Sequence, residues 1–268
     1  MWVGREPLDP DERPSVAHSR WWSANAADYL AEHGDVLGEA DFVWGPEGLE
    51  ESEAEVLGDP SELRGSRILE IGAGAAQCSR YLAGLGARVV ATDVSPGMLA
   101  EAASINASAS AEAPLVAADG LRLPFAEGSF DVVFTSFGVV PFVENLEDLF
   151  AGVARVLVPG GVFAYSAPHP VRWMFPDSPM KRDMTVTTSY FSSAPYVERG
   201  DDGELVYVEC HHTLSEHMNA LTAAGFAIER VWEPEWPKGR DVVWGGWGPE
   251  RSPWIPGTLI VRAKRRRQ

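Results

Sequence analysis

Short apolar runs alternate with amphipathic stretches through the middle of the chain. Such runs are typical of strands that are buried on both faces of a sheet. Buried strands are therefore expected at five places, over residues 68–71, 88–92, 114–117, 130–136 and 162–166. Apolar residues at helical spacing lie between them and predict helices over residues 75–85, 95–113 and 144–157. Strands that alternate with helices in this way indicate an α/β fold with an open, mostly parallel sheet.

The pattern before this alternation is different. Residues 1–14 are rich in proline and charge, so we expect them to be disordered or loosely docked. Apolar residues at helical spacing predict a helix over residues 15–33. A loop is expected over residues 35–46, followed by an acidic helix over 47–57.

The chain after residue 167 begins with a long insertion. A hairpin that turns at Asp202-Gly203 is expected inside it. Thr213 and Glu216 form a capping-box pattern, which predicts a helix to residue 224. Two more strands are expected, over residues 226–232 and 257–263.

A glycine turn and an acid mark the most informative stretch of the chain. Gly72-Ala73-Gly74 separates the first two predicted elements, and glycines let the backbone turn tightly and approach a ligand. The amides at the start of the following helix would face that ligand. Asp93 ends the second strand nineteen residues after Gly74, a spacing that suits the hydroxyl pair of a ribose. The stretch therefore predicts a site for an adenosine.

The type of adenosine cofactor follows from the neighbouring residues. A dinucleotide fingerprint would have a third glycine where this chain has Gln77, and no Gly-Lys-Ser/Thr sequence indicates a P-loop. Glu70, just before the turn, would repel a pyrophosphate and would suit an ammonium group. S-adenosylmethionine carries an ammonium and a sulfonium and has no phosphate, so it is the preferred interpretation.

Four ordered motifs carry a family resemblance. They are LEIGAGAAQCSRYLA, VVATDVSPGML, AADGLRLPFAEGSFDVVFTSFG and RVLVPGGVFAYSAP. In this order they resemble the class I S-adenosylmethionine-dependent methyltransferases, with most similarity to the ubiquinone/menaquinone-type (methyltransferase type 11) subgroup. The resemblance implies a transferase that uses S-adenosylmethionine and releases S-adenosylhomocysteine.

The same resemblance implies a Rossmann-like, seven-stranded, mostly parallel sheet with helices on both faces. Four parts are expected along the chain: an N-terminal helical cap (1–62), the cofactor-binding core (63–167), an inserted substrate cap after the fifth strand (168–213) and the C-terminal part of the core sheet (214–268). Cofactor contacts are expected from Glu70, Gly72, Ala73, Gly74, Gln77, Asp93, Val94, Met98, Asp119, Gly120, Leu121, Ser136 and Phe137. For Asp119, which would accept from the adenine amine, a purely turn-forming role beside Gly120 stays open.

Candidate catalytic and substrate-binding residues outside the motifs are assigned from their expected position in the fold alone. A base helps if the acceptor is a hydroxyl or a carbon acid. The candidate bases are His169, His211 and His212, with His18 and His217 after them. The candidates for shaping the substrate pocket are Trp22, Tyr29, Trp173, Tyr190, Tyr196, Trp236 and Trp247. We expect no metal site, because no cluster of histidine, cysteine and acid has suitable spacing.

Composition limits the possible partners. The net charge of −17 disfavours nucleic acid and anionic membrane as partners, so the expected partner is a small molecule. Two cysteines exclude a disulfide scaffold. No charged-then-apolar leader opens the chain and no apolar run nears about eighteen residues, so we expect a cytoplasmic protein without a membrane partner.

The preferred function is therefore methyl transfer by in-line displacement to a small acceptor. Many tryptophans lie outside the core motifs, and they predict an aromatic or apolar pocket for that acceptor. A nicotinamide-dependent oxidoreductase is one alternative, which Gln77, Glu70 and the lack of a Tyr-x-x-x-Lys pair disfavour. A non-catalytic S-adenosylmethionine-binding protein of the same fold is the other.

Overall fold

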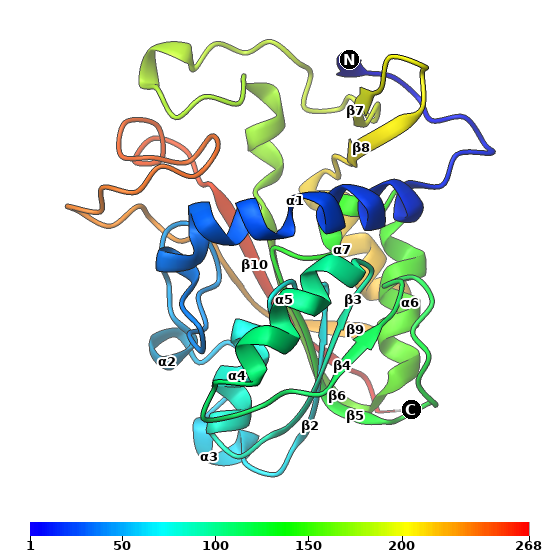
Figure 1. Ribbon diagram of the computed structural model, residues 1–268, viewed down its shortest axis with the longest axis vertical. Helices are drawn as coiled ribbons and strands as arrows, with labels where there is room; N and C mark the ends of the chain where they lie inside the picture. The colour runs from blue at the N-terminus through cyan, green and yellow to red at the C-terminus, as the bar shows by residue number, and fades with distance from the viewer. Residues whose placement is uncertain (268) are drawn as a thin grey trace.

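A seven-stranded sheet forms the centre of the computed structural model, which describes residues 1–267 (Figure 1). Its strands, in spatial order, are β4 (Leu115–Ala117), β3 (Arg88–Asp93), β2 (Arg67–Ile71), β5 (Phe130–Ser136), β6 (Leu157–Pro168), β10 (Thr258–Arg265) and β9 (Phe226–Trp232). The first five run parallel, and β10 is antiparallel to both of its neighbours. The predicted Rossmann-like, mostly parallel sheet is confirmed.

Helices cover both faces of this sheet. The helices are α1 (Pro14–Leu37), α2 (Glu51–Ala54), α3 (Pro60–Leu63), α4 (Gln77–Gly84), α5 (Pro96–Asn106), α6 (Leu146–Val156) and α7 (Leu214–Ala223). Figure 1 shows α4 and α5 on one side of the sheet and α6 and α7 on the other.

The alternation of side chains along β2 explains the two layers. Leu69 and Ile71 belong to a buried cluster that includes Leu149 of α6 and Leu221 of α7. Ile68 points the other way and packs in the cluster that includes Leu82 of α4. Burial on both faces accounts for the nearly continuous apolar runs in the sequence.

A second, smaller sheet lies beyond the carboxyl ends of the parallel strands. It is antiparallel and consists of β1 (Trp2–Arg5), β7 (Tyr196–Arg199) and β8 (Leu205–Glu209). The predicted hairpin is β7–β8, with Asp202 and Gly203 in its turn. Helix α1 contacts β8 on this sheet and α5 on the core, so it lies between them (Figure 1).

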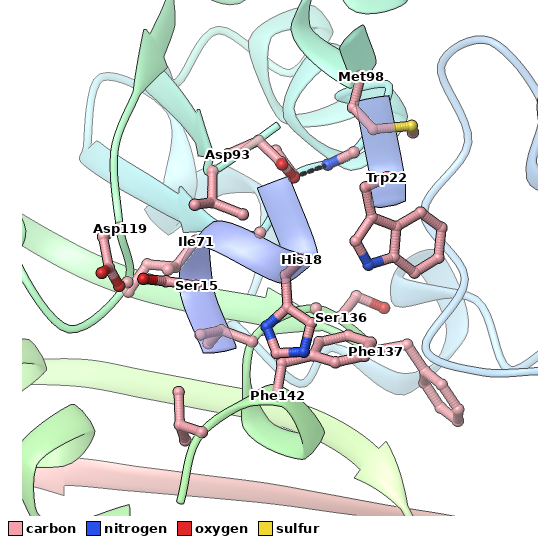
Figure 2. A pocket seen from close by; sticks show the side chains of 18 of the residues that line it. Ser15, His18, Trp22, Ile71, Asp93, Met98, Asp119, Ser136, Phe137 and Phe142 are labelled. Carbon is pink, nitrogen blue, oxygen red and sulfur yellow. Dashed lines mark hydrogen bonds between the residues drawn. The ribbon is translucent and has the colours of Figure 1, made fainter. Parts of the chain in front are cut away.

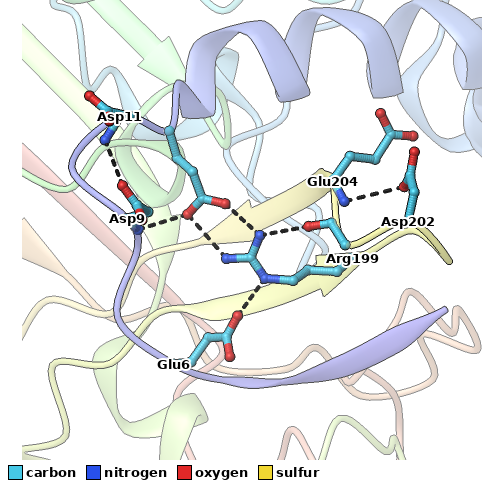
Figure 3. Close-up of polar contacts among 8 residues, drawn as sticks. Glu6, Asp9, Asp11, Arg199, Asp202 and Glu204 are labelled. Atoms are coloured by element: carbon cyan, nitrogen blue, oxygen red, sulfur yellow. Dashed lines mark hydrogen bonds and ion pairs between the residues drawn. The ribbon is translucent and has the colours of Figure 1, made fainter.

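The N-terminal residues differ from the expectation. Residues 1–14 were expected to be disordered or loosely docked, but β1 pairs with β7, and Arg199 of β7 forms ion pairs with Glu6 and Glu12 (Figure 3). The partners of this segment lie almost two hundred residues away in sequence, which is why local composition misled the prediction.

Two helix predictions were too long. Within the acidic stretch 47–57 only Glu51–Ala54 is helical, because Glu55 adopts a left-handed conformation with φ 46°. One acidic side chain there is buried instead: Glu51 is 3% exposed and accepts hydrogen bonds from the backbone of Val56 and Leu57. The helix expected to reach residue 113 ends at Asn106. Conversely, α1 continues to Leu37.

Across residues 1–267, no helix combines the length and the apolar character needed to cross a membrane.

Candidate active site

A cavity of about 590 Å³ lies at the carboxyl ends of the parallel strands, beneath α1 (Figure 2). This volume is in the range of sites for small molecules, about 300–1,000 Å³. All thirteen residues expected to contact the cofactor line it: Glu70, Gly72, Ala73, Gly74, Gln77, Asp93, Val94, Met98, Asp119, Gly120, Leu121, Ser136 and Phe137. The sequence motifs are thus brought together at one place.

The glycine turn forms one wall of the cavity, where two loops touch. Gly72 has φ 69°, and a Cβ there would lie 3.1 Å from both Gly138 Cα and Val139 N. A side chain at Gly72 is therefore disfavoured both by the backbone conformation and by the tight space. Because the two backbones are in close contact, the ends of β2 and β5 contribute to the same wall. The absence of a side chain at Gly72 leaves the cavity beside this wall free for a ligand.

Asp93 connects the ends of two strands. Its Oδ2 accepts a hydrogen bond from Gly74 N at 2.8 Å, and its Oδ1 accepts one from Ser95 N at 2.8 Å. Burial raises the pKa of the carboxyl group, and the two backbone hydrogen bonds oppose that rise. A carboxylate offers about four acceptor positions, so two remain for a ribose hydroxyl pair.

Glu70 is buried at the floor of the cavity. Its Oε2 accepts a hydrogen bond from Ser79 Oγ of α4. Burial raises its pKa to about 8, although the bond from Ser79 acts in the opposite direction. A ligand ammonium would favour the charged form, so the carboxyl group suits the ammonium contact expected of it.

Asp119 has the turn-forming role that was the alternative to an adenine contact. Its Oδ1 accepts a hydrogen bond from Leu121 N at 3.0 Å. Its second oxygen has no hydrogen-bond partner within residues 1–267, so the turn and an adenine contact are compatible. Gly120 follows in the wall, where a Cβ would lie 2.7 Å from Val139 Cγ2.

Helix α1 forms the roof and is bonded to the core. Ser19 Oγ donates to the carbonyl oxygen of Val94 at 2.8 Å, and Ser23 Oγ lies 2.9 Å from Ser95 Oγ. Trp22 and Tyr29, two of the candidates for shaping a substrate pocket, line the cavity from this roof. These contacts bring α1 directly over the ends of β3 and α5.

Several lining residues were not predicted from sequence. The main ones are Ser15, Val16, Leu30, Leu37, Phe142 and Trp244, together with His18, which was a secondary candidate. For α1 a signal was present, because Ser15, His18, Trp22 and Tyr29 follow one stripe at helical spacing. Trp244 belongs to an irregular loop, and no local pattern marks it.

The three preferred candidate bases lie outside this cavity. His169 caps the 3-10 helix Pro170–Met174: its Nδ1 accepts from Val171 N, and its Nε2 lies 2.8 Å from Glu233 Oε1. Nε2 of His211 donates to the carbonyl oxygen of Tyr190, and Nε2 of His212 to that of Val143. His211 thus bonds within the inserted segment, whereas His212 and His169 connect that segment to other parts of the chain.

Five of the predicted pocket aromatics are also elsewhere: Trp173, Tyr190, Tyr196, Trp236 and Trp247. The Trp173 ring packs under the guanidinium groups of Arg5 and Arg172, at 4.8 and 5.0 Å. Trp247 packs behind the cavity wall, with its ring centre 5.8 Å from that of Phe137. These rings pack against other side chains outside the cavity, a role that composition alone did not distinguish from ligand binding.

No group of three or more histidine, cysteine or acidic side chains in residues 1–267 is arranged to hold a metal ion.

Comparisons with known proteins agree with this geometry. A family described as methyltransferase domain matches residues 69–165. A demethylmenaquinone methyltransferase from Parafrankia sp. is 41% identical over 150 residues, which are 48% of this chain and 59% of that protein. The chain thus spans about half the length of the curated relatives it matches, with 59% and 51% covered in two of them.

Solved structures match over more of the chain. An S-adenosylmethionine-dependent methyltransferase from Mesorhizobium loti is 30% identical, with a TM-score of 0.65 over 82% of this chain and 100% of that chain. The 1,6-didemethyltoxoflavin-N1-methyltransferase of Burkholderia thailandensis, solved with bound 1,6-didemethyltoxoflavin and S-adenosylhomocysteine, shares the fold at 17% identity, with a TM-score of 0.56 over 98% of this chain and 95% of that one. The coverage and identity of the Mesorhizobium match, with the ordered motifs around one cavity, show that this chain belongs to the S-adenosylmethionine-dependent methyltransferases.

Proposed function

We propose that this protein transfers a methyl group from S-adenosylmethionine to a small acceptor that binds in the same cavity. The observation that carries the proposal is the cavity itself, which is lined by all thirteen cofactor candidates and also by residues of α1. The sulfonium supplies an activated methyl group, so the protein must mainly align the two partners and exclude water.

The lining beyond the cofactor candidates indicates the kind of acceptor. Apolar and aromatic side chains dominate it: Trp22, Leu30, Leu37, Phe142, Val143 and Trp244. Such a surface favours a flat, largely apolar ring. The relatives named demethylmenaquinone methyltransferase support a quinone-type ring among such acceptors.

Hydride transfer is less consistent with the site. Glu70 lies buried at the turn where a dinucleotide would place its pyrophosphate, and Gln77 begins α4 where the fingerprint has a glycine. A non-catalytic cofactor-binding protein remains the second candidate, since it would use the same cavity. The cytoplasmic location expected from the sequence stays a prediction.

Two measurements test the proposal. Thermal unfolding should shift to higher temperature with S-adenosylhomocysteine and S-adenosylmethionine and not with NAD, because a ligand that binds the folded state stabilises it. Methyl-labelled S-adenosylmethionine should then transfer label to members of a panel of small aromatic acceptors. A shift with NAD alone would contradict the cofactor assignment. Binding without transfer to any acceptor class would favour the non-catalytic candidate.

A further inference from the structure

His18 is the one histidine, within residues 1–267, whose side chain lines the cavity. It lies on α1 and is 3% exposed. Figure 2 shows its ring beneath the roof helix, between Ser15 and the group formed by Ser136 and Phe137. In the view of Figure 2 the ring lies between Asp119, a candidate for the adenine contact, and the ring of Trp22.

The tautomer of His18 follows from its one hydrogen bond. Nε2 lies 2.9 Å from the carbonyl oxygen of Val208, in β8 of the inserted hairpin. A carbonyl oxygen only accepts, so Nε2 carries the hydrogen and Nδ1 of the neutral ring carries a lone pair. Nδ1 has no hydrogen-bond partner in the part of the chain described here. The hairpin thus holds the His18 ring through Nε2, and Nδ1 remains available to accept a proton.

The surroundings keep this ring neutral. Burial lowers the pKa of His18, and the Val208 carbonyl and the carboxylates of Glu209 and Asp119 only partly oppose this. The rings of Phe142 and Tyr207 pack edge-on against it, with centres 5.1 and 6.1 Å away. Burial also raises the pKa of Tyr207, so its phenol stays uncharged. At neutral pH the side chain is therefore a free base next to the cavity.

We propose that Nδ1 of His18 accepts the proton from the acceptor atom that receives the methyl group, and that this acceptor is a hydroxyl of the phenol or enol class. The inference rests on the proposed methyl transfer. The acceptor O–H bond breaks and its proton moves to Nδ1, while the oxygen forms a bond to the methyl carbon. The carbon–sulfur bond breaks with its electron pair remaining on sulfur, and the imidazolium later returns the proton to water.

A hydroxyl acceptor is the kind of acceptor that needs such a base. A neutral hydroxyl is a weak nucleophile, and removal of its proton in the transition state typically contributes about 10²–10⁴ in rate. An amine acceptor already has an available lone pair and depends less on a base. A free Nδ1 at the cavity therefore favours an acceptor that must lose a proton, such as a hydroxyl, over an amine.

His18→Gln is the informative variant, because the amide nitrogen of glutamine can still donate to Val208 while the basic Nδ1 is lost. Label transfer to simple phenols such as 1-naphthol should fall about 100-fold or more. Affinity for S-adenosylhomocysteine should stay within about twofold, which shows that the variant is folded. The wild-type rate should decrease toward low pH with a midpoint below 6.5, the usual histidine pKa, and this acid limb should disappear in the variant.

His33→Gln is the matched control, since His33 lies on the same helix and does not line the cavity. It should retain the acid limb. A His18→Ala variant provides a second test, because added imidazole should restore part of its turnover. Nitrogen-15 NMR of labelled histidine gives a readout without turnover: His18 should show a protonated Nε2 and an unprotonated Nδ1 at pH 7.

The outcomes separate this inference from the proposed function. If wild type does not bind S-adenosylhomocysteine, the proposed function fails. If it binds but methylates 1-naphthylamine and no phenol, the hydroxyl assignment is overturned. Turnover of His18→Gln within about twofold of wild type, or a protonated Nδ1 at pH 7, overturns the role of His18.

Discussion

Asp93 and Gly74 are joined by a 2.8 Å hydrogen bond from the backbone N–H of the glycine to the carboxylate Oδ2. The bond connects the turn after β2 to the end of β3, which are neighbouring parallel strands. The acid that would bind a ribose is thus also the acid that orients the glycine turn. Ligand binding and local structure depend on one side chain.

Asp93→Ala should weaken binding of S-adenosylhomocysteine by about 1.5–3 kcal/mol, roughly tenfold to 150-fold, because charge-assisted hydrogen bonds are lost. Isothermal calorimetry would measure it. Asp131→Asn is the control: Asp131 pairs with Arg67 by a 2.7 Å contact and does not line the cavity. That variant should keep its affinity. Equal affinities for Asp93→Ala and wild type would remove Asp93 from the binding site.

Gly72→Ala should destabilise the fold by about 1–3 kcal/mol, because the left-handed backbone is strained by a side chain. Its Cβ would also press on Gly138 and Val139, so ligand affinity should fall as well. Gly152→Ala is the matched control in α6, where a Cβ would meet nothing within 4 Å. It should be neutral or up to about 1 kcal/mol more stable through helix propensity. Urea unfolding measures both, and similar effects of the two changes would refute the account of the turn.

Two buried tryptophans provide a comparison of hydrogen-bonded and unbonded indoles. Trp44 Nε1 donates to Glu51 Oε2 at 2.8 Å, whereas Trp247 Nε1 has no partner in residues 1–267. Both substitutions by phenylalanine remove similar apolar area. Trp44→Phe should therefore cost about 1–2 kcal/mol more than Trp247→Phe, from the broken bond to a buried carboxyl group. Equal losses in denaturant unfolding would show that Trp247 is bonded in solution.

The acid stability of the protein should depend on His217. Burial lowers the pKa of His217 to about 3, and the nearby His212 and His211 act in the same direction. Since the folded-state pKa lies below the unfolded value, this stability is present above about pH 6.5 and is lost as the pH falls. Between pH 7.5 and pH 5 the loss should be about 2 kcal/mol.

His217→Asn is the comparison variant for this pH effect, because its amide can replace the contact of Nδ1 with the Tyr165 hydroxyl at 3.0 Å. Its unfolding free energy should fall by about 2 kcal/mol less than that of wild type over the same pH range. Parallel pH curves for the two proteins would exclude His217 as the cause.

His169→Ala should affect stability and leave cofactor affinity unchanged. The variant loses the cap on Val171 N and the contact with Glu233, which should cost about 1 kcal/mol. Thermal unfolding and calorimetry with S-adenosylhomocysteine measure the two effects. A loss of affinity larger than about tenfold would place His169 at the cavity in solution.

The core of the site was predictable because its signals are local. The turn at Gly72, the acid at Asp93 and the start of α5 at Ser95 are each set by neighbours in sequence, and the order of parallel strands brings them together. Ser95 Oγ accepts from Met98 N and caps α5. The resemblance to known methyltransferases supplied the rest of the cofactor set.

The cap was less predictable because its contacts are distant in sequence. His18 bonds Val208, and Arg240 Nε donates to the carbonyl oxygen of Pro46, each across about 190 residues. A histidine after a strand end, such as His169, has the same local pattern whether its ring faces a ligand or caps a turn. Only the path of the inserted chain decides between these roles.

The ion pairs of Arg199 with Glu6 and Glu12 also bear on when the N-terminal segment can dock during synthesis (Figure 3). Residues 2–5 obtain their strand partner only when residues 196–199 have been made. By then the strands from β2 to β6 have been synthesised and can pair with one another. The N-terminal strand is therefore tied to the small sheet only after the parallel strands that carry the glycine turn and Asp93 have been made.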